Sequence, residues 1–323
     1  MAIKHMSAAR VAKNDEFYTQ FNDIQKEVNA YIDYDKNTFK DKIILCPCDN
    51  PETSEFVKFF ILNFNRFGLK KLICTSYIKN GKGRLFITDH EFDPVKITWT
   101  ELNGNGDFRS EEVTKFRDES DIIITNPPFS LFREFIQWIK EKQFLILGSI
   151  NAISYKEIFP LIKDTKVCIG KTFNEVLLFR QPNTQELRKM SGIVWFTNLM
   201  HGRRNEKIKY MTMADNLKCN KRLVGTDAYK KYDNYDAIEI PFSNAIPSDY
   251  NGYMGVPISW LGSYNPEQFE IIGPFNNGIQ GKELGAKKIE IITSGKSMLS
   301  YGPVINKRAV YARIIIKHRK INI

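Results

Sequence analysis

The sequence predicts an α/β protein whose mainly parallel sheet carries helices on both faces. Short runs of aliphatic and β-branched residues alternate, between about residues 42 and 197, with segments whose apolar residues recur every three to four positions. Such alternation of strand and helix is typical of a parallel sheet, and an antiparallel strand can join its end. At 323 residues, the chain has room for one such domain and a smaller second one.

The composition fits a globular protein that binds a polyanion. Hydrophobic residues make up 42% of the chain and charged residues 26%, which is ordinary for a water-soluble domain. The formal net charge is +10 and the pI is about 9.2, which favours a polyanionic partner; charge alone does not exclude a basic protein without such a partner. No apolar run approaches the ~18–20 residues that cross a bilayer, and the N-terminus lacks the apolar segment of a secretory signal. We therefore expect a cytoplasmic protein without membrane contact.

The cysteines and histidines predict no metal site. The five cysteines form an odd, scattered set, which favours reduced thiols inside a cell over a disulfide framework. Cys46 and Cys48 are separated by one residue instead of the two that zinc sites usually have, and the four histidines are isolated.

The first elements precede the sheet. Residues 1–14 are basic and polar, and they are either a frayed terminus or an arm that lies over phosphates, with Lys13 as a candidate contact. Residues 15–20 then lead into a helix that continues to Ile32. The first strand, 42–49, ends at Asp49 and precedes a helix for which Thr53 or Ser54 is a plausible cap.

The turns after the first two strands carry candidate binding residues. The first turn has no glycine, unlike the usual nucleotide-binding turn, and Asp49 there is either a carboxylate near a cofactor or a helix cap. The second strand, 71–76, ends in Thr75 and Ser76, where many folds place an acidic residue for a ribose.

The next stretch predicts a loop, a strand and a polar turn. Residues 79–96 resemble an exposed hairpin or loop, and 97–100 are expected to form a third strand. The polar turn 103–109 contains Asp107 and Phe108. It is either a surface loop, which its glycines and asparagines suit, or part of a pocket. The pocket is favoured, because a Phe directly after Gly-Asp is unusual in a solvated loop. A helix is expected to follow, from Arg109 and Ser110 to Phe116.

The most informative stretch is a buried strand, 121–125, followed by Asn126-Pro127-Pro128-Phe129 and a helix to Ile139. Two prolines cannot continue a strand ladder, so the Asn126 side chain and the Pro127 carbonyl are left as two acceptors. Two acceptors suit the amine of a heterocyclic base, because hydrogen bonds from both protons localise its lone pair and aim it at an electrophile. Phe129 can stack on the ring that carries the amine.

The remaining segments of the sheet are shorter. We expect strands at 143–150, 167–170, 176–179 and 192–197 and a helix at 155–162. Trp195 and Phe196 point to opposite faces of a strand. One of them is expected in the core and the other in the wall of the substrate pocket, with core packing of both as the alternative.

The composition changes after about residue 200. Lysine and arginine become frequent and are interleaved with aromatic and amide residues, as contacts to phosphates and base edges require; a solvated, loop-rich lobe is the alternative. Candidate DNA contacts are Arg203, Arg204, Lys221 and Arg222. Residues 293–297 resemble half of a phosphate loop, but Glu290 stands where its first glycine should be, so we predict no nucleoside triphosphate site.

Asn126 to Phe129 after an apolar strand resembles the catalytic motif of S-adenosylmethionine-dependent amino-methyltransferases. Further stretches resemble the EcoRI-type adenine-specific DNA methyltransferases, from about residue 14 to near the C-terminus. These stretches are 15–20, 46–49, 106–109, 195–198, 232–236, 249–252, 255–258 and 265–269. The glycine-free turn after the first strand departs from the general methyltransferase pattern and matches the EcoRI-type variant.

The resemblance implies a Rossmann-like class I methyltransferase fold. Residues 1–200 would form the catalytic domain, with 1–14 as its basic arm, and 201–323 the DNA target-recognition region. The cofactor would be S-adenosyl-L-methionine, converted to S-adenosyl-L-homocysteine, without a metal. Its expected contacts are Phe17, Tyr18, Thr19, Cys46, Asp49, Ser76, Asp107, Phe108 and Asn126. The expected catalytic residues are Asn126, Pro127, Pro128 and Phe129.

The resemblance also implies an enzyme that methylates adenine N6 at a specific site in double-stranded DNA, on a base flipped out of the helix. It would be the modification partner of a restriction endonuclease that it does not contact, in the cytoplasm of a bacterium or in a phage-infected cell, as a monomer. GAATTC is the site suggested by the family. The residues themselves leave open cytosine N4, RNA or a protein glutamine as the substrate, or a DNA-binding protein without catalysis.

Overall fold

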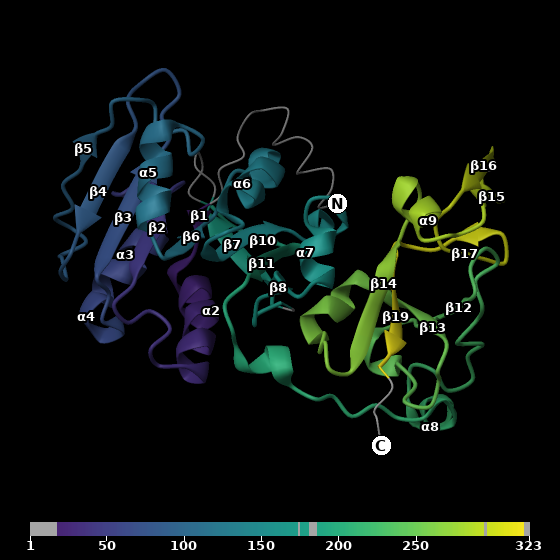
Figure 1. Ribbon diagram of the computed structural model, residues 1–323. Helices are drawn as coiled ribbons and strands as arrows, with labels where there is room; N and C mark the ends of the chain where they lie inside the picture. The colour runs from purple at the N-terminus through teal and green to yellow at the C-terminus, as the bar shows by residue number, and fades with distance from the viewer. Residues whose placement is uncertain (1–17, 174, 181–185, 294–295, 320–323) are drawn as a thin grey trace. The chain divides into compact units, whose positions relative to one another are not determined.

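The computed structural model describes residues 18–173, 175–180, 186–293 and 296–319 (Figure 1). The predicted arm with Lys13, and also Phe17, lie outside the described residues. The chain divides into two compact units. Unit 1 comprises residues 1–158 and 166–202, and unit 2 comprises 159–165 and 203–323.

Unit 1 is built on an eight-stranded mixed sheet in the order β5-β4-β3-β2-β6-β7-β11-β8. The four central strands, β3, β2, β6 and β7, run parallel to one another, and β4 and β11 pair with them antiparallel. The strands are β2 (Ile43–Cys46), β3 (Lys71–Ser76), β4 (Arg84–Thr88), β5 (Thr100–Glu101), β6 (Ile122–Thr125), β7 (Gln143–Ser149), β8 (Cys168–Ile169) and β11 (Ile193–Thr197). β2 and β6 are buried along their whole length, which explains their unbroken apolar sequences.

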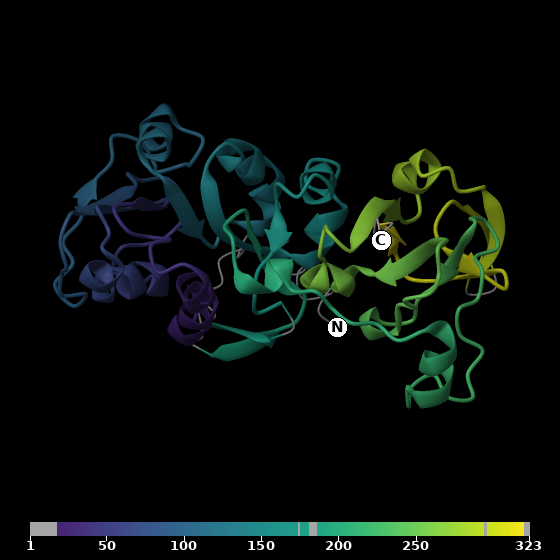
Figure 2. The same ribbon diagram turned by 60° about the horizontal axis from the view of Figure 1, so that its bottom comes forward.

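Helices cover both faces of this sheet (Figure 2). In the described part of unit 1 the helices are α2 (Phe21–Tyr34), α3 (Glu55–Leu62), α4 (Phe64–Phe67), α5 (Glu111–Glu119) and α6 (Phe132–Ile139), with 3₁₀ turns η1 (Phe129–Leu131) and η2 (Ile150–Ser154). Ser54 caps α3 by accepting from the amides of Phe56 and Val57, and Ser110 caps α5. Both helix starts agree with the sequence prediction.

Two buried acids of α2 hold a small sheet, β1 (Tyr18–Thr19), β9 (Leu177–Arg180) and β10 (Leu187–Met190), and the segment that leads into it. Asp23 accepts from the amide of Leu178 in β9 at 2.8 Å. Glu27 accepts from the amide and hydroxyl of Thr172, between β8 and β9, at 2.8 and 2.7 Å. Because β1 pairs with β9, the bond to Leu178 also helps to position Thr19.

Three sequence predictions about elements were wrong. The third strand is β4, inside the stretch expected to be an exposed hairpin or loop, because Phe86 is buried there and β4 pairs with β3. Residues 97–99 form no strand. The helix expected at 155–162 is only α7 (Phe159–Lys163), and it packs against β14 of unit 2.

Unit 2 contains a four-stranded sheet in the order β12-β13-β19-β14 and two hairpins. Its strands are β12 (Ala237–Glu239), β13 (Tyr253–Pro257), β14 (Phe269–Phe275), β15 (Ile289–Thr293), β16 (Lys296–Ser300), β17 (Val304–Ile305), β18 (Arg308–Ala309) and β19 (Arg313–His318). Its other helices are α8 (Met213–Cys219) and α9 (Ile279–Glu283), and its 3₁₀ turns are η4 (Ser243–Ala245) and η5 (Ile258–Ser263); η3 (Gly202–Asn205) lies where the chain passes from unit 1 to unit 2. No helix in the described part of the chain is long and apolar enough to span a membrane.

Candidate active site

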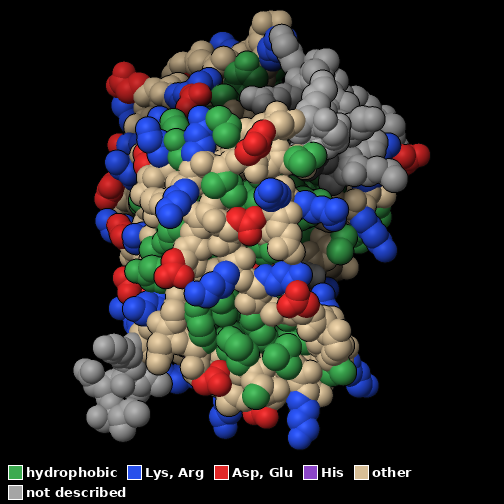
Figure 3. All heavy atoms as spheres, turned by 90° about the vertical axis from the view of Figure 1, so that its right-hand side faces the viewer, with side chains coloured by type: hydrophobic (Ala, Val, Ile, Leu, Met, Phe, Trp, Pro, Cys, Tyr) green, Lys and Arg blue, Asp and Glu red, His purple; other side chains and the backbone are tan. Residues whose placement is uncertain are grey.

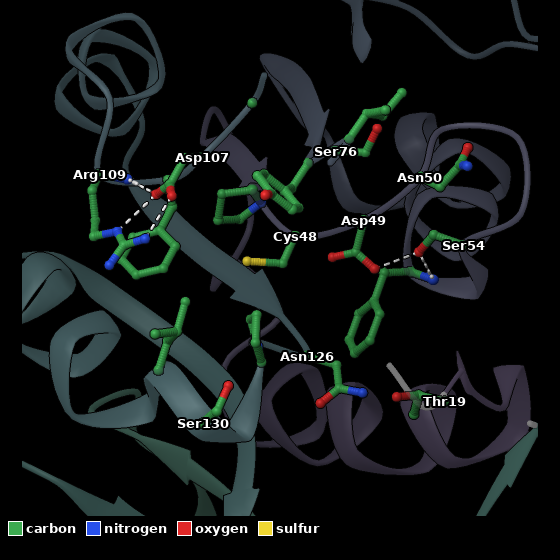
Figure 4. Close-up of a pocket in the computed structure, with 18 of the residues that line it drawn as sticks. Thr19, Cys48, Asp49, Asn50, Ser54, Ser76, Asp107, Arg109, Asn126 and Ser130 are labelled. Carbon is green, nitrogen blue, oxygen red and sulfur yellow. Dashed lines mark hydrogen bonds and ion pairs between the residues drawn. The ribbon is translucent and has the colours of Figure 1, made fainter. Parts of the chain in front are cut away.

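A cavity of about 520 Å³ opens where the parallel strands β2, β3 and β6 end (Figure 4). This is the edge at which open α/β sheets bind ligands. Seven of the residues predicted from the sequence line it: Thr19, Asp49, Ser76, Asp107, Phe108, Asn126 and Pro128. They come from five separate segments of the chain, which the fold of unit 1 brings together.

Asp49 is the most enclosed charged group of the cavity. One carboxylate oxygen accepts from the Ser54 hydroxyl at 2.6 Å, and the other accepts from the Thr125 hydroxyl at 2.5 Å. Burial raises the pKa of the Asp49 carboxyl to about 6, although both hydroxyls lower it. Asp49 is therefore not itself the cap of α3: it holds the capping serine and faces the cavity.

The turn that carries Asp49 is held without glycine by β3. The amide of Asp49 donates to the Thr75 carbonyl at 3.0 Å, the Thr75 hydroxyl donates to the Pro47 carbonyl at 3.2 Å, and the Cys74 thiol donates to the Asp49 carbonyl. Cys48 and Asn50, the neighbours of Asp49, also line the cavity. Cross-strand hydrogen bonds replace the glycines that shape this turn in other nucleotide-binding folds.

Asp107 is held by Arg109. The Arg109 guanidinium donates to both carboxylate oxygens, at 2.9 and 2.6 Å, and also to Glu134 at 2.7 Å. The hydrogen bond from Arg109 lowers the pKa of Asp107. Phe108 is buried with its ring centroid 5.0 Å from that of Phe135, and it lines the cavity. The turn 103–109 is thus part of a pocket.

Two buried hydroxyls of the cavity are unsatisfied. Thr19 Oγ1 and Ser76 Oγ have no hydrogen-bond partner among the described residues. Most buried polar groups in proteins are hydrogen-bonded, so two such hydroxyls on one cavity indicate a place for a polar ligand. Backbone packing is also close here: the carbonyl of Ser76 faces Gly106, which has a φ of +80°.

Asn126 follows directly on the last ladder residue of β6, because pairing with β7 stops at Thr125 and Ile146. Asn126 and Pro128 line the cavity. Pro127 is buried and Phe129 is half-buried against the core of unit 1; neither lines this cavity. The carbonyl of Pro128 accepts from Leu131 and starts η1, so the turn passes at once into the following helices.

Three predicted residues lie away from the site. Cys46 is fully buried within β2, and Cys48, beyond the end of the strand, lines the cavity in its place. Trp195 and Phe196 are both buried, which corrects the expectation that one of them walls the substrate pocket. β11 lies between β7 and β8 with both faces covered, so Trp195 packs on Phe56 and Phe196 on Phe132.

Of the predicted DNA contacts, Lys221 and Arg222 lie on unit 2, with Lys221 exposed and the Arg222 guanidinium 3.9 Å from the centre of the Phe242 ring. Arg204 is half-buried and donates to the Thr165 carbonyl; Arg203 lies in η3. In unit 1, Tyr18 lies in β1.

Sequence reasoning missed Tyr77, Ile78 and Ser130 as lining residues. Only their position in the chain, just beyond the ends of β3 and β6, could have indicated that they line the cavity.

The comparisons with known proteins agree with this geometry. A family model described as adenine-specific methyltransferase EcoRI matches residues 5–319. The chain belongs to this family. Type II methyltransferase M.EcoRI of Escherichia coli is 36% identical, over 98% of this chain and 97% of the relative. Type II methyltransferases M.MgeORF184P of Mycoplasma genitalium and M.MpnI of Mycoplasma pneumoniae are 37% and 36% identical, each over 98% of this chain and over 99% and 98% of the relative. No solved structure matches it.

The cavity fits the cofactor that membership of a methyltransferase family implies. S-adenosyl-L-methionine has an adenine, a ribose and an amino-acid end with an ammonium group. The cavity offers the carboxylates of Asp49 and Asp107 for amines, two unsatisfied hydroxyls and the aromatic residues Phe56, Tyr77 and Phe108. Its size is that of a small-molecule site. Among the described residues, no cluster of His, Cys, Asp and Glu could hold a metal ion.

Proposed function

We propose that the protein transfers a methyl group from S-adenosyl-L-methionine to the N6 amine of an adenine at a specific site in duplex DNA. The observation that carries this proposal is that Asn126, the first residue beyond β6, lines the same cavity as Asp49 and Asp107. An amide acceptor and two carboxylates, of which that of Asp49 is buried, are thereby placed within one site. The chain is similar to Type II methyltransferases over 97–99% of their length, which supports this proposed activity.

Each part of the site then has a role. The bound cofactor supplies an electrophilic methyl group on a sulfonium. Asp49, Asp107, Ser76 and Thr19 hold and orient it, and Arg109 keeps Asp107 ionised and in place. The Asn126 side-chain oxygen, on the cavity, accepts one amine proton. The carbonyl of Pro127, the next residue of the turn although not itself on this cavity, accepts the other, so that the nitrogen lone pair is aimed at the methyl group, and the prolines keep both acceptors rigid. Positioning of this kind can contribute roughly 7–11 kcal/mol at its upper limit.

The substrate base must leave the duplex to reach a strand-end pocket, at a cost of a few kcal/mol. Two acceptors reject thymine and guanine at this position, because carbonyl groups would face carbonyl groups and leave buried acceptors unpaired. Cytosine N4 carries the same two protons as adenine N6. The preference for adenine therefore rests on the family, and cytosine N4 is the second candidate.

In the proposed role the protein is the modification enzyme of a restriction system, acts on DNA in the cytoplasm as a monomer, and does not contact its endonuclease. Residues 203–323, with most of the net positive charge, would form the target-recognition region. GAATTC is the proposed site, taken from the family.

The test is a nucleoside analysis of the reaction products. Duplex DNA, RNA and a protein extract are each incubated with the purified protein and S-adenosyl-L-methionine carrying a tritiated methyl group. The DNA is then digested to nucleosides. We expect the label in duplex DNA, as N6-methyldeoxyadenosine. Label only in N4-methylcytosine would overturn the choice of base, label only in RNA or protein would overturn the choice of substrate, and DNA binding without transfer would overturn catalysis. Sequencing the modified positions gives the recognition site.

A further inference from the structure

Unit 2 carries most of the net positive charge of the protein. Its residues include 20 Lys and Arg against 12 Asp and Glu, a net charge of +8 out of the +10 of the whole chain. On the side of the molecule that Figure 3 shows, lysine and arginine side chains are interspersed with exposed hydrophobic ones. Charge alone does not say which part of unit 2 meets a polyanion, but two hairpins combine charge with unusual exposed side chains.

The first hairpin is the two-stranded ribbon β15–β16. Pairing sets Glu290 opposite Leu299 and Ile292 opposite Ser297. Side chains alternate between the faces of a ribbon, so these four residues share one face. Ile291, on the other face, is buried at 3% exposure, whereas Ile292 and Leu299 are 63% and 56% exposed. The outward face therefore presents two large apolar residues beside a carboxylate and a hydroxyl, and Ser297 donates a hydrogen bond to Glu290.

The second hairpin, β17–β18, presents cations next to this ribbon. The amide of Ile292 donates to the carbonyl of Lys307 at 3.4 Å, so the turn lies against β15. Asp233 accepts from the amides of Asn306 and Lys307, at 3.2 and 2.7 Å, and anchors the turn. Lys307 and Arg308 are exposed, as are Lys287 and Lys288, which directly precede β15. No acidic side chain pairs with these four cations among the described residues.

We propose that these two hairpins bind duplex DNA, with the outward face of β15–β16 in the major groove and the four flanking cations on phosphates. This deepens the proposed function and rests on it. A two-stranded ribbon of five residues per strand is about 17 Å long, and the major groove, ≈ 12 Å wide, admits such a ribbon.

The chemistry of the outward face matches base edges. Isoleucine and leucine side chains contact the thymine methyl group, a glutamate accepts from the N4 amine of cytosine, and a serine serves either as donor or as acceptor. The cations contribute affinity that is independent of sequence, and the ribbon contributes the choice of sequence. This division explains why apolar side chains stay exposed on a unit with a net charge of +8.

Two double variants separate the two contributions. Lys307→Ala/Arg308→Ala removes phosphate contacts, and Ile292→Ser/Leu299→Ser removes apolar base contacts. The controls lie on unit 1. Lys36→Ala/Lys140→Ala makes the same charge change on exposed residues, and Val95→Ser changes an apolar residue that is 90% exposed. Affinity is measured by fluorescence anisotropy, with one duplex that contains the site found by sequencing and one of equal length in which that site is scrambled.

We expect the Lys307/Arg308 variant to bind both duplexes more weakly, and the slope of log affinity against log salt to fall by about 2. The Ile292/Leu299 variant should lose roughly tenfold in affinity for the target duplex and little for the scrambled one. Both variants should bind S-adenosyl-L-homocysteine like the wild type, because unit 1 is unchanged.

Unchanged affinity and salt slope in the Lys307/Arg308 variant would overturn the phosphate contacts. An equal loss on both duplexes in the Ile292/Leu299 variant, or a change in oligomeric state by light scattering without a change in DNA affinity, would overturn base reading by the ribbon. Failure of the wild-type protein to methylate any duplex is a separate result, because it overturns the proposed function whichever variant is tested.

Discussion

The hydroxyl of Thr125 donates a hydrogen bond of 2.5 Å to the carboxylate of Asp49. Thr125 is the last residue of β6 and immediately precedes Asn126, whereas Asp49 follows β2. This bond joins the turn that carries the proposed amine acceptors to the acid that faces the cofactor cavity. The two halves of the proposed reaction are therefore held in one buried hydrogen-bonded unit with Ser54.

We predict that Thr125→Val weakens cofactor binding and that Thr125→Ser preserves it. Valine has the shape of threonine but no hydroxyl, and a hydrogen bond to a charged group contributes about 1.5–3 kcal/mol, so affinity for S-adenosyl-L-homocysteine should fall by at least ~10-fold. The Thr125 hydroxyl lowers the pKa of Asp49. Without it that pKa rises, and the pH at which binding is lost on acidification should rise as well. Calorimetric titrations between about pH 5.5 and pH 8 measure both effects. Wild-type affinity of the valine variant across this range would contradict the positioning role of Thr125.

We predict that Asp49→Asn makes the protein more stable and unable to bind the cofactor. The pKa of Asp49 is about 6 in the folded protein and 3.8 in an unperturbed carboxyl, so the folded state binds more protons between these values. The free energy of unfolding therefore falls as pH rises from about 4 to about 6. Asparagine avoids the buried charge and should add up to ~3 kcal/mol near pH 7.5, and less near pH 4.5. Urea denaturation at the two pH values checks this gain; an equal gain at both would show that the charge is not its cause.

We predict that Asn126→Ala lowers the methylation rate by at least ~10²-fold, as does the removal of one preorganised polar contact in other enzymes. The matched control is Asn151→Ala. Asn151 also follows the carboxyl end of a central strand, β7, but it is exposed and does not line the cavity. Single-turnover rates with saturating cofactor and duplex DNA measure the methyl-transfer step. A wild-type methylation rate in the Asn126→Ala variant would contradict the proposed role of the Asn126 side chain.

We predict that Gly106→Ala disrupts the cavity and that Gly104→Ala in the same turn is tolerated. A Cβ at Gly106 would lie 2.1 Å from the Ser76 carbonyl oxygen, and its φ of +80° is strained for alanine. At Gly104 the nearest atom would be 3.6 Å away, on the Glu112 side chain. The first variant should lose roughly 1–3 kcal/mol of stability together with cofactor affinity. Thermal unfolding of both variants, with and without S-adenosyl-L-homocysteine, measures these losses. Equal melting temperatures of the two variants would contradict close packing between Gly106 and the Ser76 carbonyl.

Local patterns in the sequence predicted the framework of unit 1. The sequences of β2, β3, β6 and β7 are mainly apolar because these strands are buried on both faces, and the two prolines after Asn126 end β6 on covalent grounds. Ser54 and Ser110 begin their helices because a serine oxygen satisfies free amides of the first turn. Such features need only neighbours in the chain, so the sequence carries them without reference to the rest of the fold.

What the sequence by itself determined is therefore where the parallel strands end, and hence that Asp49, Ser76 and Asn126 lie at one edge of the sheet. The expectation for Asp107 came from the family resemblance. Only the tertiary structure decided which face each side chain meets. It placed Cys48 at the cavity and Cys46 in the core, and buried both Trp195 and Phe196 because β11 is covered on its two faces. It also joined Thr125 to Asp49 across 76 positions of the chain. Periodicity gives the direction of a side chain relative to its own strand, but contacts between distant segments depend on which elements pack against that strand.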